Sequence, residues 1–250
     1  MSRAVLITGA SGGIGRAIAR AFAGAGDRVA VHYGGNRSGA EETLASLNGS
    51  GHAIVSGDLA SPQAPPEIVA ATVEALGGID VLVNNAALMV AHPIAEVTYE
   101  DWLDAWRRTA AVNLHGTANL SYCAAREMIA RKTAGRIVNI GSRGAFRGEP
   151  AHPAYGATKA AVHAMAQSLA VALAPHGIGV ASVAPGFIAT DRVSARLDGA
   201  EGAAIRAQSP FGRVGEPGEV ASAVLWLASP DALWASGTVL DVNGASYLRT

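Results

Sequence analysis

The sequence is short of several residue types, and each shortage excludes a class of protein. One cysteine, Cys123, excludes an internal disulfide, and its apolar, alanine-rich surroundings predict a small buried residue rather than a nucleophile. Only 16% of the residues are charged and the formal net charge is -1, so no overall field favours nucleic acid or an anionic membrane. Apolar runs are shorter than the ~18 residues of a membrane span, and the first is too short for a signal peptide. We therefore expect a cytoplasmic protein with neither a membrane nor a nucleic-acid partner.

Lysine is also scarce, because Lys132 and Lys159 are the only two in the chain. Lys159 follows Tyr155 by four positions, so on a helix both side chains lie on one face. One interpretation is a surface helix with a solvated lysine, and the other is a phenol influenced by an ammonium group. The histidines have no short metal-ligand spacing and no carboxylate cluster beside them, so no metal site is expected.

Short β-rich runs alternate with longer helical stretches along the whole chain. Strands are expected at residues 4–8, 28–33, 52–58, 78–86, 135–142, 177–186 and 237–244. Helices are expected at residues 13–25, 39–47, 65–76, 99–131, 153–174 and 218–229. Apolar strands in this alternation predict a single α/β domain, with a doubly wound parallel sheet of about seven strands and helices on both faces. The stretch 187–217 has the least regular pattern of apolar and polar residues. It predicts an excursion or lid beside the sheet.

The first strand runs into a glycine loop, TGASGGIG, that opens the first helix. Glycines there permit a tight turn, and the free N–H groups of a helix start suit a pyrophosphate. The loop lacks the usual G-x-G-x-x-G spacing, and no Gly-Lys-Ser/Thr follows it. A second interpretation is the G-x-S-x-G nucleophile elbow of an α/β-hydrolase, with Ser11 as the nucleophile. The position after the first strand, without an evident Asp and His in order, argues against it.

Four motifs in order resemble the short-chain dehydrogenase/reductase family across essentially the whole chain. They are TGASGGIG at 8–15, NNAA at 84–87, a tetrad of Asn113, Ser142, Tyr155 and Lys159, and PGFIAT at 185–190. The chain departs from the family pattern at Ala87, usually glycine, and in its C-terminal DVNG. The resemblance implies a Rossmann-type fold and hydride transfer between a nicotinamide and a carbonyl or alcohol carbon.

The tetrad also makes chemical sense by residue type. A carbonyl that accepts hydride develops oxyanion charge, which the hydroxyls of Tyr155 and Ser142 can receive as hydrogen-bond donors. In the reverse direction Tyr155 must lose its proton, which costs roughly 4 kcal/mol for a free phenol at neutral pH. A nearby lysine cation reduces that cost, so we assign this role to Lys159. By resemblance, Lys159 also binds the nicotinamide ribose, and Asn113 holds a water in a proton relay; the alternative for Asn113 is a helix-interior amide bonded to backbone.

The end of the second strand bears on the choice of cofactor. An acid that would bond the adenosine 2′-hydroxyl is replaced by Tyr33, and Asn36, Arg37 and Ser38 follow it. Arg37 has the planar fork that suits a 2′-phosphate, and the alternative is a solvated loop arginine. Gly12 stands where many NADP-dependent relatives carry a basic residue, which argues the other way. The sequence predicts NADP(H) in preference to NAD(H).

The resemblance also implies a set of cofactor contacts. They are Gly9, Ser11, Gly12, Gly13, Ile14, Gly15, Tyr33, Asn36, Arg37, Ser38, Asp58, Leu59, Asn85, Ala86, Ala87, Tyr155, Lys159, Pro185, Gly186, Ile188 and Thr190. Asp58, with Leu59 beside it, resembles the residue that contacts the adenine amino group.

The substrate is less defined than the reaction. Within the family, residues 185–229 look most like 3-oxoacyl-(acyl-carrier-protein) reductases, which implies a lid from Phe187 to about Phe211 and an acidic carrier as partner. Arg126, Arg131, Lys132 and Arg136 form a basic cluster that suits such a carrier, or else a solvated helix end.

Four residues near the expected substrate mouth are candidate substrate contacts: Arg143, Phe146, Arg147 and Phe187. The two arginines suit a phosphopantetheine phosphate, or equally a small acidic or polar ketone. The alternatives are a reductase of a small ketone, sugar or polyol, and a cofactor-binding protein that is catalytically silent. Many relatives are tetramers, and the alanine-rich surface of the 157–174 helix suits a homotetramer interface.

Overall fold

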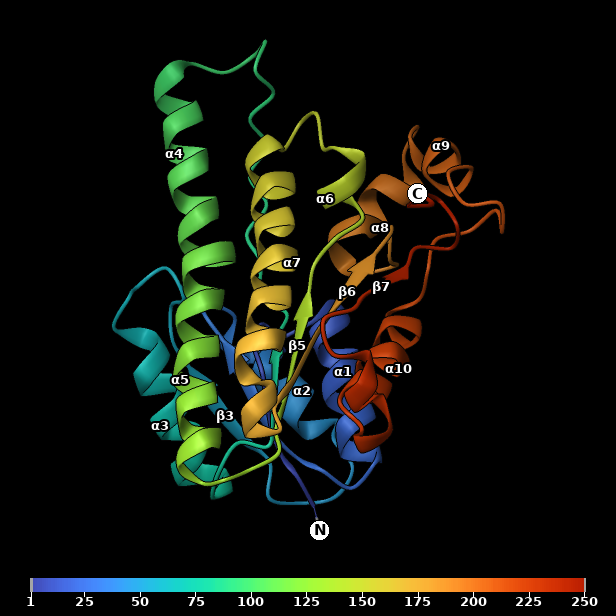
Figure 1. The fold of residues 1–250 in the computed structure, drawn as a ribbon. Helices are drawn as coiled ribbons and strands as arrows, with labels where there is room; N and C mark the ends of the chain where they lie inside the picture. The colour runs from blue at the N-terminus through green and yellow to red at the C-terminus, as the bar shows by residue number, and fades with distance from the viewer. Residues whose placement is uncertain (1, 250) are drawn as a thin grey trace.

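The protein is built on one parallel sheet of seven strands. The computed structural model describes residues 2–249, the side chains of residues 192 and 195 excepted. The strand order is β3-β2-β1-β4-β5-β6-β7, and every pairing is parallel (Figure 1). The strands are β1 Ala4–Ile7, β2 Arg28–Tyr33, β3 Ala53–Ser56, β4 Val81–Asn84, β5 Arg136–Ile140, β6 Gly179–Pro185 and β7 Val239–Val242. The order reverses between β1 and β4, so their carboxyl ends open onto a topological switch point.

Helices cover both faces of the sheet. One face carries α1 Gly13–Gly24, α2 Arg37–Ala45 and α10 Pro217–Leu227, and the other carries α3 Ala64–Leu76, α4 Tyr99–Ala110, α5 Thr117–Ala130 and α7 Pro153–Leu173. A π-helical segment, η1 Ala111–Gly116, joins α4 to α5. Shorter pieces are α6 Gly144–Arg147, η2 Ala174–His176, α8 Asp191–Asp198, α9 Gly202–Arg206 and η3 Pro230–Ala235. No described helix combines the length and the hydropathy that crossing a bilayer would need.

The strands alternate their side chains between two apolar clusters. On β1, Val5 and Ile7 pack with α1 and α10, whereas Ala4 and Leu6 pack with α3, α5 and α7. All four are at most 1% exposed. A strand buried on both faces needs no polar positions, which is why the strands read as nearly continuous apolar runs. The predicted fold class is therefore confirmed.

The structure differs from the sequence expectation in two stretches. The region expected as one helix over 99–131 is interrupted by the π-helical turn η1, in which the backbone accommodates one extra residue per turn. This turn contains Asn113. The stretch 187–217, expected to have little order, contains α8 and α9. Figure 1 shows both beside the C-terminal segment, at the end of the molecule to which the strands point.

Three of the described histidines are buried in this architecture, His32, His92 and His163, and the pKa is lowered at the first and the last of them. His32 on β2 is 1% exposed, and its ring bonds the backbone of two loops: the Gly9 N–H donates to Nδ1 at 3.3 Å, and Nε2 lies 3.0 Å from the Gly57 carbonyl oxygen. His163 on α7 is 4% exposed and packs against Gly141, where a Cβ atom would meet its ring. Burial disfavours the imidazolium form and lowers the pKa of each to about 4.

Acidification is expected to destabilise the fold through these two side chains. An unfolded histidine titrates near pH ~6.5, so between about pH 6.5 and about pH 4 the unfolded chain binds more protons than the folded one. Above this window the free energy of unfolding has its full value. As the pH decreases through the window, the free energy of unfolding falls by up to about 1.4 kcal/mol per pH unit for each histidine. Urea unfolding at about pH 7.5 and about pH 5 measures the loss, and His32→Gln and His163→Leu should each reduce it. Variants that lose as much stability as the wild type would contradict this assignment.

Candidate active site

The loops after β1 and β4 are clamped together at the switch point. The Thr8 hydroxyl oxygen accepts hydrogen bonds from the backbone N–H groups of Asn85 and Ala86, at 2.9 and 3.0 Å. The Asn85 side-chain amide donates to the carbonyl oxygens of Thr8 and Gly9, at 2.9 and 3.0 Å. Asn85 and Ala86, expected at the cofactor, thus fix the start of the glycine loop.

The glycine loop is packed so closely that it excludes side chains at two positions. Gly9 has φ +61°, and a Cβ there would lie 2.9 Å from Ala86 Cα, while at Gly15 it would lie 2.3 Å from the Gly9 carbonyl oxygen. Gly12, in contrast, has open space around it. The start of α1 has no side-chain cap and no acidic residue in its first turn, so its N–H groups and positive dipole end fit an anion. These features fit the pyrophosphate of a dinucleotide.

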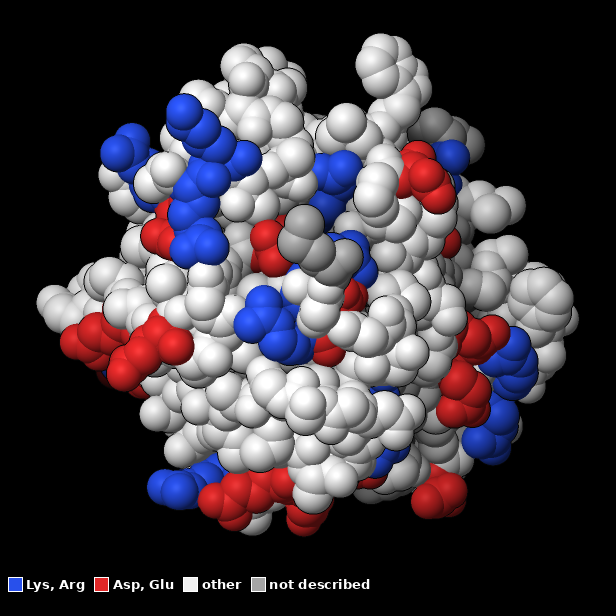
Figure 2. Space-filling model, turned by 90° about the horizontal axis from the view of Figure 1, so that it is seen from below, with Lys and Arg blue, Asp and Glu red and all other residues white. Residues whose placement is uncertain are grey.

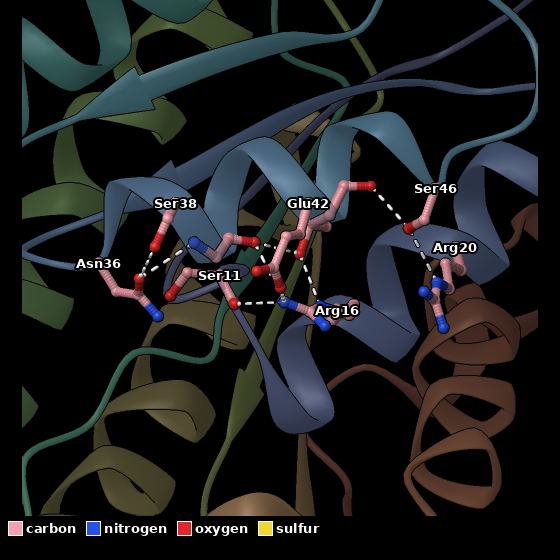
Figure 3. A network of polar contacts seen from close by, with 9 residues as sticks. Ser11, Arg16, Arg20, Asn36, Ser38, Glu42 and Ser46 are labelled. Carbon is pink, nitrogen blue, oxygen red and sulfur yellow. Dashed lines mark hydrogen bonds and ion pairs between the residues drawn. The ribbon is translucent and has the colours of Figure 1, made fainter.

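Arg16 joins the glycine loop to α2, a link that sequence reasoning missed. Figure 3 shows its guanidinium directed at α2, where it donates to Thr43 Oγ1 at 2.9 Å, to the Gly39 carbonyl at 3.2 Å and to Glu42 at 2.9 Å. The same group donates to the Ser11 carbonyl at 3.0 Å. An arginine four residues beyond Gly12 that bonds several carbonyls holds the loop rigidly, and only the packing of α1 against α2 reveals it.

The residues expected around the adenosine lie on two adjacent loops. Asn36 caps α2 by accepting from the Gly39 N–H at 3.0 Å, and Ser38 donates to the same side-chain oxygen at 3.2 Å (Figure 3). Arg37 is 75% exposed and pairs with Glu41 through Nε at 2.9 Å. Tyr33 ends β2. On the next loop, Asp58 accepts from the Ala60 N–H at 2.9 Å, and Leu59 is buried.

The four tetrad residues come from three elements that meet beside β5. Ser142 lies in the loop after β5, and its hydroxyl accepts from the Gly144 N–H at 2.9 Å. Tyr155 and Lys159 lie one turn apart on α7, with the Lys159 ammonium 5.7 Å from the Tyr155 ring centre. Lys159 is 3% exposed and donates to the Ile140 carbonyl at 2.6 Å. This hydrogen bond directs the ammonium toward the carboxyl end of β5, just before Ser142.

Asn113 has its amide engaged by the loop after β4. It accepts from the Leu88 N–H at 2.7 Å and donates to the Leu88 carbonyl at 2.9 Å and to Thr158 Oγ1 at 3.3 Å. The side chain is 1% exposed. Its bonds are therefore to the backbone of another element, not to its own helix. Thr158 lies directly before Lys159, so this amide also links η1 to α7.

His92 is a second residue that sequence reasoning missed. Its Nδ1 lies 2.8 Å from the Val90 carbonyl oxygen, and its Nε2 accepts from the Ala154 N–H at 3.1 Å. Ala154 is in the first turn of α7, so the ring satisfies an N–H group that the helix itself cannot, directly before Tyr155. The ring also packs edge-on against Trp102, 5.3 Å between centres. A lone histidine in a loop carries no signal for this role.

The loop after β6 closes the site from the other side. Pro185 accepts from the Arg143 N–H at 2.9 Å, which ties this loop to the one that carries Ser142. Thr190 lies over the glycine loop, because its Cγ2 is 3.3 Å from where a Gly13 Cβ would be. Gly186 and Ile188, expected at the cofactor, lie between them, and Ile188 is buried.

A cavity of about 260 Å³ lies between the lid, the loop after β5 and the C-terminal segment. Arg143, Phe187 and Gln208 line it. Phe146, expected at the substrate, does not; its ring stacks on His163 with centres 5.2 Å apart and lies 4.7 Å from the Arg249 guanidinium. It packs there because α6 turns its ring toward α7.

One member of the basic cluster before β5, Arg136, is not accessible to a carrier, while Arg126, Arg131 and Lys132 are exposed. Arg136 is 8% exposed and bonds the carbonyls of Ala134, Gly135, Gly177 and Ser229. Arg131 and Lys132 end α5 directly before β5, so they lie at the amino edge of the sheet, opposite the active site. Figure 2 shows that acidic and basic side chains are interspersed on that face. Arg136 was expected to be accessible because the sequence does not reveal that its guanidinium meets the carbonyls of distant segments, such as Gly177 and Ser229.

Sequence and structure comparisons agree with this geometry. Residues 9–245 match the family model described as enoyl-(acyl carrier protein) reductase. The chain is 36% identical to L-rhamnose 1-dehydrogenase (NAD(P)(+)) of Sphingomonas sp., covering 99% of this chain and 97% of the relative. It is 38% identical to 3-oxoacyl-(acyl-carrier-protein) reductase of Vibrio cholerae, covering 98% of each.

A solved structure leads to the same family. The acetoin dehydrogenase of Salmonella typhimurium superposes with a TM-score of 0.83 at 30% identity, covering 98% of this chain and 96% of that one. The hydrolase hypothesis is therefore wrong. The histidine beside the glycine loop, His32, could not act as a base for Ser11, because both of its ring nitrogens contact backbone groups. The glycine loop at the switch point, the whole-chain family match and these relatives together establish that the chain belongs to the short-chain dehydrogenase/reductase family of NAD(P)-dependent oxidoreductases.

Proposed function

We propose that this oxidoreductase interconverts the carbonyl and the alcohol of a short, polar substrate, with Tyr155 as the proton donor and acceptor. The observation that carries the proposal is the placement of Tyr155 and Lys159 on one face of α7, beside the loop of Ser142. A buried ammonium fixed by a backbone carbonyl is not a solvated surface lysine. The Lys159 ammonium lies close enough to Tyr155 to favour negative charge on the phenolic oxygen, and we propose that it also contacts the nicotinamide ribose.

Each residue has a separate task in the proposed reaction. The nicotinamide, when bound, supplies or accepts the hydride. Tyr155 donates its hydroxyl proton to the oxygen that becomes an alcohol, and Ser142 donates a hydrogen bond to the same oxygen. Lys159 favours negative charge on the phenolic oxygen and holds the nicotinamide ribose. Asn113 fixes the backbone at Leu88 and positions a water molecule next to Lys159. This water is the last group in the relay that carries the proton.

Tyr155→Phe is expected to reduce kcat by roughly 10²-fold or more, because general acid–base catalysis contributes about that much. The affinity for NADPH, measured by fluorescence titration, and the unfolding midpoint should change little. Tyr99→Phe, at the exposed first residue of α4, is the matched control and should keep wild-type kinetics. A Tyr155→Phe enzyme with more than about a tenth of the wild-type rate would contradict the assignment. A silent cofactor-binding protein would instead bind NADPH and turn over nothing.

The proposed cofactor is NADP(H) in preference to NAD(H). The loop after β2 offers no carboxylate to a ribose 2′-hydroxyl, since Glu41 and Glu42 on α2 are each paired with an arginine. Arg37 uses only Nε for Glu41, so its two terminal amino groups remain for a phosphate. Asn36 and Ser38, held by their mutual hydrogen bond, lie beside it. These contacts support recognition of a 2′-phosphate through Arg37.

Arg37→Ala should lower kcat/KM for NADPH about tenfold or more and leave that for NADH nearly unchanged, because a charge-assisted hydrogen bond contributes roughly 1.5–3 kcal/mol. Gly12→Arg should have the opposite effect, since Gly12 is extended and has open space for a basic side chain. Arg20→Ala removes a neighbouring exposed arginine from α1 and is the control. Equal efficiency of the wild type with both cofactors would overturn the preference.

We also propose that the protein self-associates through the face formed by α4, α5 and α7. Large apolar side chains are exposed there: Leu103 is 50%, Tyr122 66% and Val171 79% exposed. A homotetramer would cover such a face on each copy. The mass in solution, by light scattering, measures the number of copies.

The substrate proposal rests on the cavity beneath the lid. Its volume of about 260 Å³ is at the low end for ligand pockets, and Arg143, Gln208 and Ser246 give it a polar lining. The second candidate is a 3-oxoacyl thioester carried on an acidic carrier protein. The apolar side chains of Ile205 and Phe211 in the same lining favour it.

Short polar ketones and sugars should turn over with at least about tenfold higher kcat/KM than an acetoacetyl thioester, because the cavity is small and Arg143, Gln208 and Ser246 place polar groups in it. The assay follows NADPH with diacetyl and dihydroxyacetone, and NADP⁺ reduction with L-rhamnose. Free and carrier-linked acetoacetyl thioesters are compared under the same conditions. Higher efficiency with the carrier-linked thioester would replace the first candidate by the second and leave the reductase assignment intact.

A further inference from the structure

Two guanidinium groups converge on one neutral oxygen beneath the lid. Arg143 Nη2 donates to Gln208 Oε1 at 3.0 Å, and Arg147 Nη1 donates to the same oxygen. Arg143 also donates to Ser246 Oγ at 2.7 Å. The Arg143 side chain is 5% exposed, and its guanidinium lies 5.2 Å from the Phe187 ring centre. A lid residue thus brings a carbonyl oxygen, which bears only a partial charge, to a place where two cations meet.

The buried cation has no counter-ion among the described residues. Neither Arg143 nor Arg147 forms an ion pair, whereas Glu219 and Asp241, the acids that line the same cavity, are already paired with other arginines. Burial of an unpaired ion costs several kcal/mol, so a site of this kind gains free energy when an anion enters. Burial, together with the nearby charge of Arg147, lowers the pKa of Arg143.

Among the described residues, Glu149 is a further acid close to both arginines. It acts on them through space but lies beyond ion-pair distance of either. Its carboxylate packs against Gly144 instead, where a Cβ would meet Oε1 at 2.4 Å. Burial raises the pKa of Glu149, and a single carboxylate can offset at most one of the two positive charges. The arginine pair therefore retains an excess of positive charge.

The pair is positioned to meet a substrate. Arg143 directly follows Ser142, and its own N–H bonds the Pro185 carbonyl at 2.9 Å. The side chains of Ser142 and Arg143 therefore start from adjacent backbone positions in the loop after β5. Phe187, which lies over the Arg143 guanidinium, begins the lid. Arg143 and Phe187 both line the cavity beneath the lid, so an anion that enters this cavity meets the Arg143 guanidinium.

We propose that Arg143 and Arg147 bind an anionic group of the substrate, a carboxylate or a phosphate, which takes the place of the Gln208 side-chain oxygen. Guanidinium forks match the paired oxygens of both groups. The proposal rests on the proposed carbonyl–alcohol activity and narrows its substrates to short acidic ones. The lid then senses the anion through Gln208, which must move when the anion binds.

The first test measures binding without turnover, in the full-length enzyme saturated with NADP⁺ so that the cofactor's phosphate sites are filled. The thermal midpoint should rise with added acetate or inorganic phosphate relative to chloride at equal ionic strength. Arg143→Gln should abolish the rise, and Arg206→Gln, which removes an exposed lid arginine, should keep it. The anion that gives the larger rise identifies carboxylate or phosphate as the natural group.

Gln208→Glu keeps the test decisive if Arg143→Gln fails to fold. A carboxylate at position 208 would occupy the site permanently, so the midpoint should rise without added anion and respond no further to acetate or phosphate. A wild type that shows no anion-specific rise overturns the proposal, and so does an equal rise in wild type and Gln208→Glu.

The second test compares charged and neutral members of a pair as substrates: acetoacetate with its ethyl ester, and dihydroxyacetone phosphate with dihydroxyacetone. The ratio of kcat/KM, charged over neutral, should fall at least tenfold in Arg143→Gln and stay constant in Arg206→Gln. A ratio unchanged in Arg143→Gln overturns the proposal. If none of the four compounds is reduced, the proposed activity fails for them, while the thermal measurements still decide the anion site.

Discussion

The clamp between Thr8 and Asn85 is the constraint on which the rest of the site depends. One hydroxyl and one amide join the loops after β1 and β4, the two strands between which the sheet reverses its order. That junction holds Gly9 so close to Ala86 that no side chain fits. His32 and Arg16 then extend the restraint, to the loop after β3 and to α2 respectively. The cofactor cradle is therefore rigid before any ligand binds, which reduces the entropy that binding must offset.

The catalytic end is organised around the start of α7. His92 bonds the first turn of the helix, Asn113 reaches its second turn through Thr158, and Lys159 bonds the end of β5. Three elements far apart in the sequence thus hold the first two turns of α7 in place. The backbone at Tyr155 is therefore rigid, and the position of its hydroxyl depends only on its own side-chain torsions. The π-helical turn is part of this arrangement, because it rotates Asn113 toward Leu88.

The lid is built differently, and the difference suits a part that moves. Besides buried Ile188 and Ile205, side-chain hydrogen bonds hold it, such as Arg143 with Gln208 and Ser209 with the Gly244 carbonyl at 2.6 Å. A neutral bond of this kind is worth about 1 kcal/mol and one from a charged donor about 1.5–3 kcal/mol, so breaking them costs little compared with separating packed strands. If Arg143 binds an anion as proposed, selection of a substrate and closure of the lid over it depend on the same residue.

The sequence alone was sufficient to predict the parallel sheet, the order of its elements, the glycine loop and the Y-x-x-x-K helix. These follow from local periodicity and from spacings within single segments, which the chain carries wherever it folds. Sequence reasoning could not predict that Arg136 is buried, that Phe146 turns toward His163, or that His92, Arg16 and Gln208 belong to the site. Each of these depends on two segments meeting at one point, and no spacing records that distance. Local preference determines the elements, whereas packing decides which side chains share an environment and hence which charges stay unpaired.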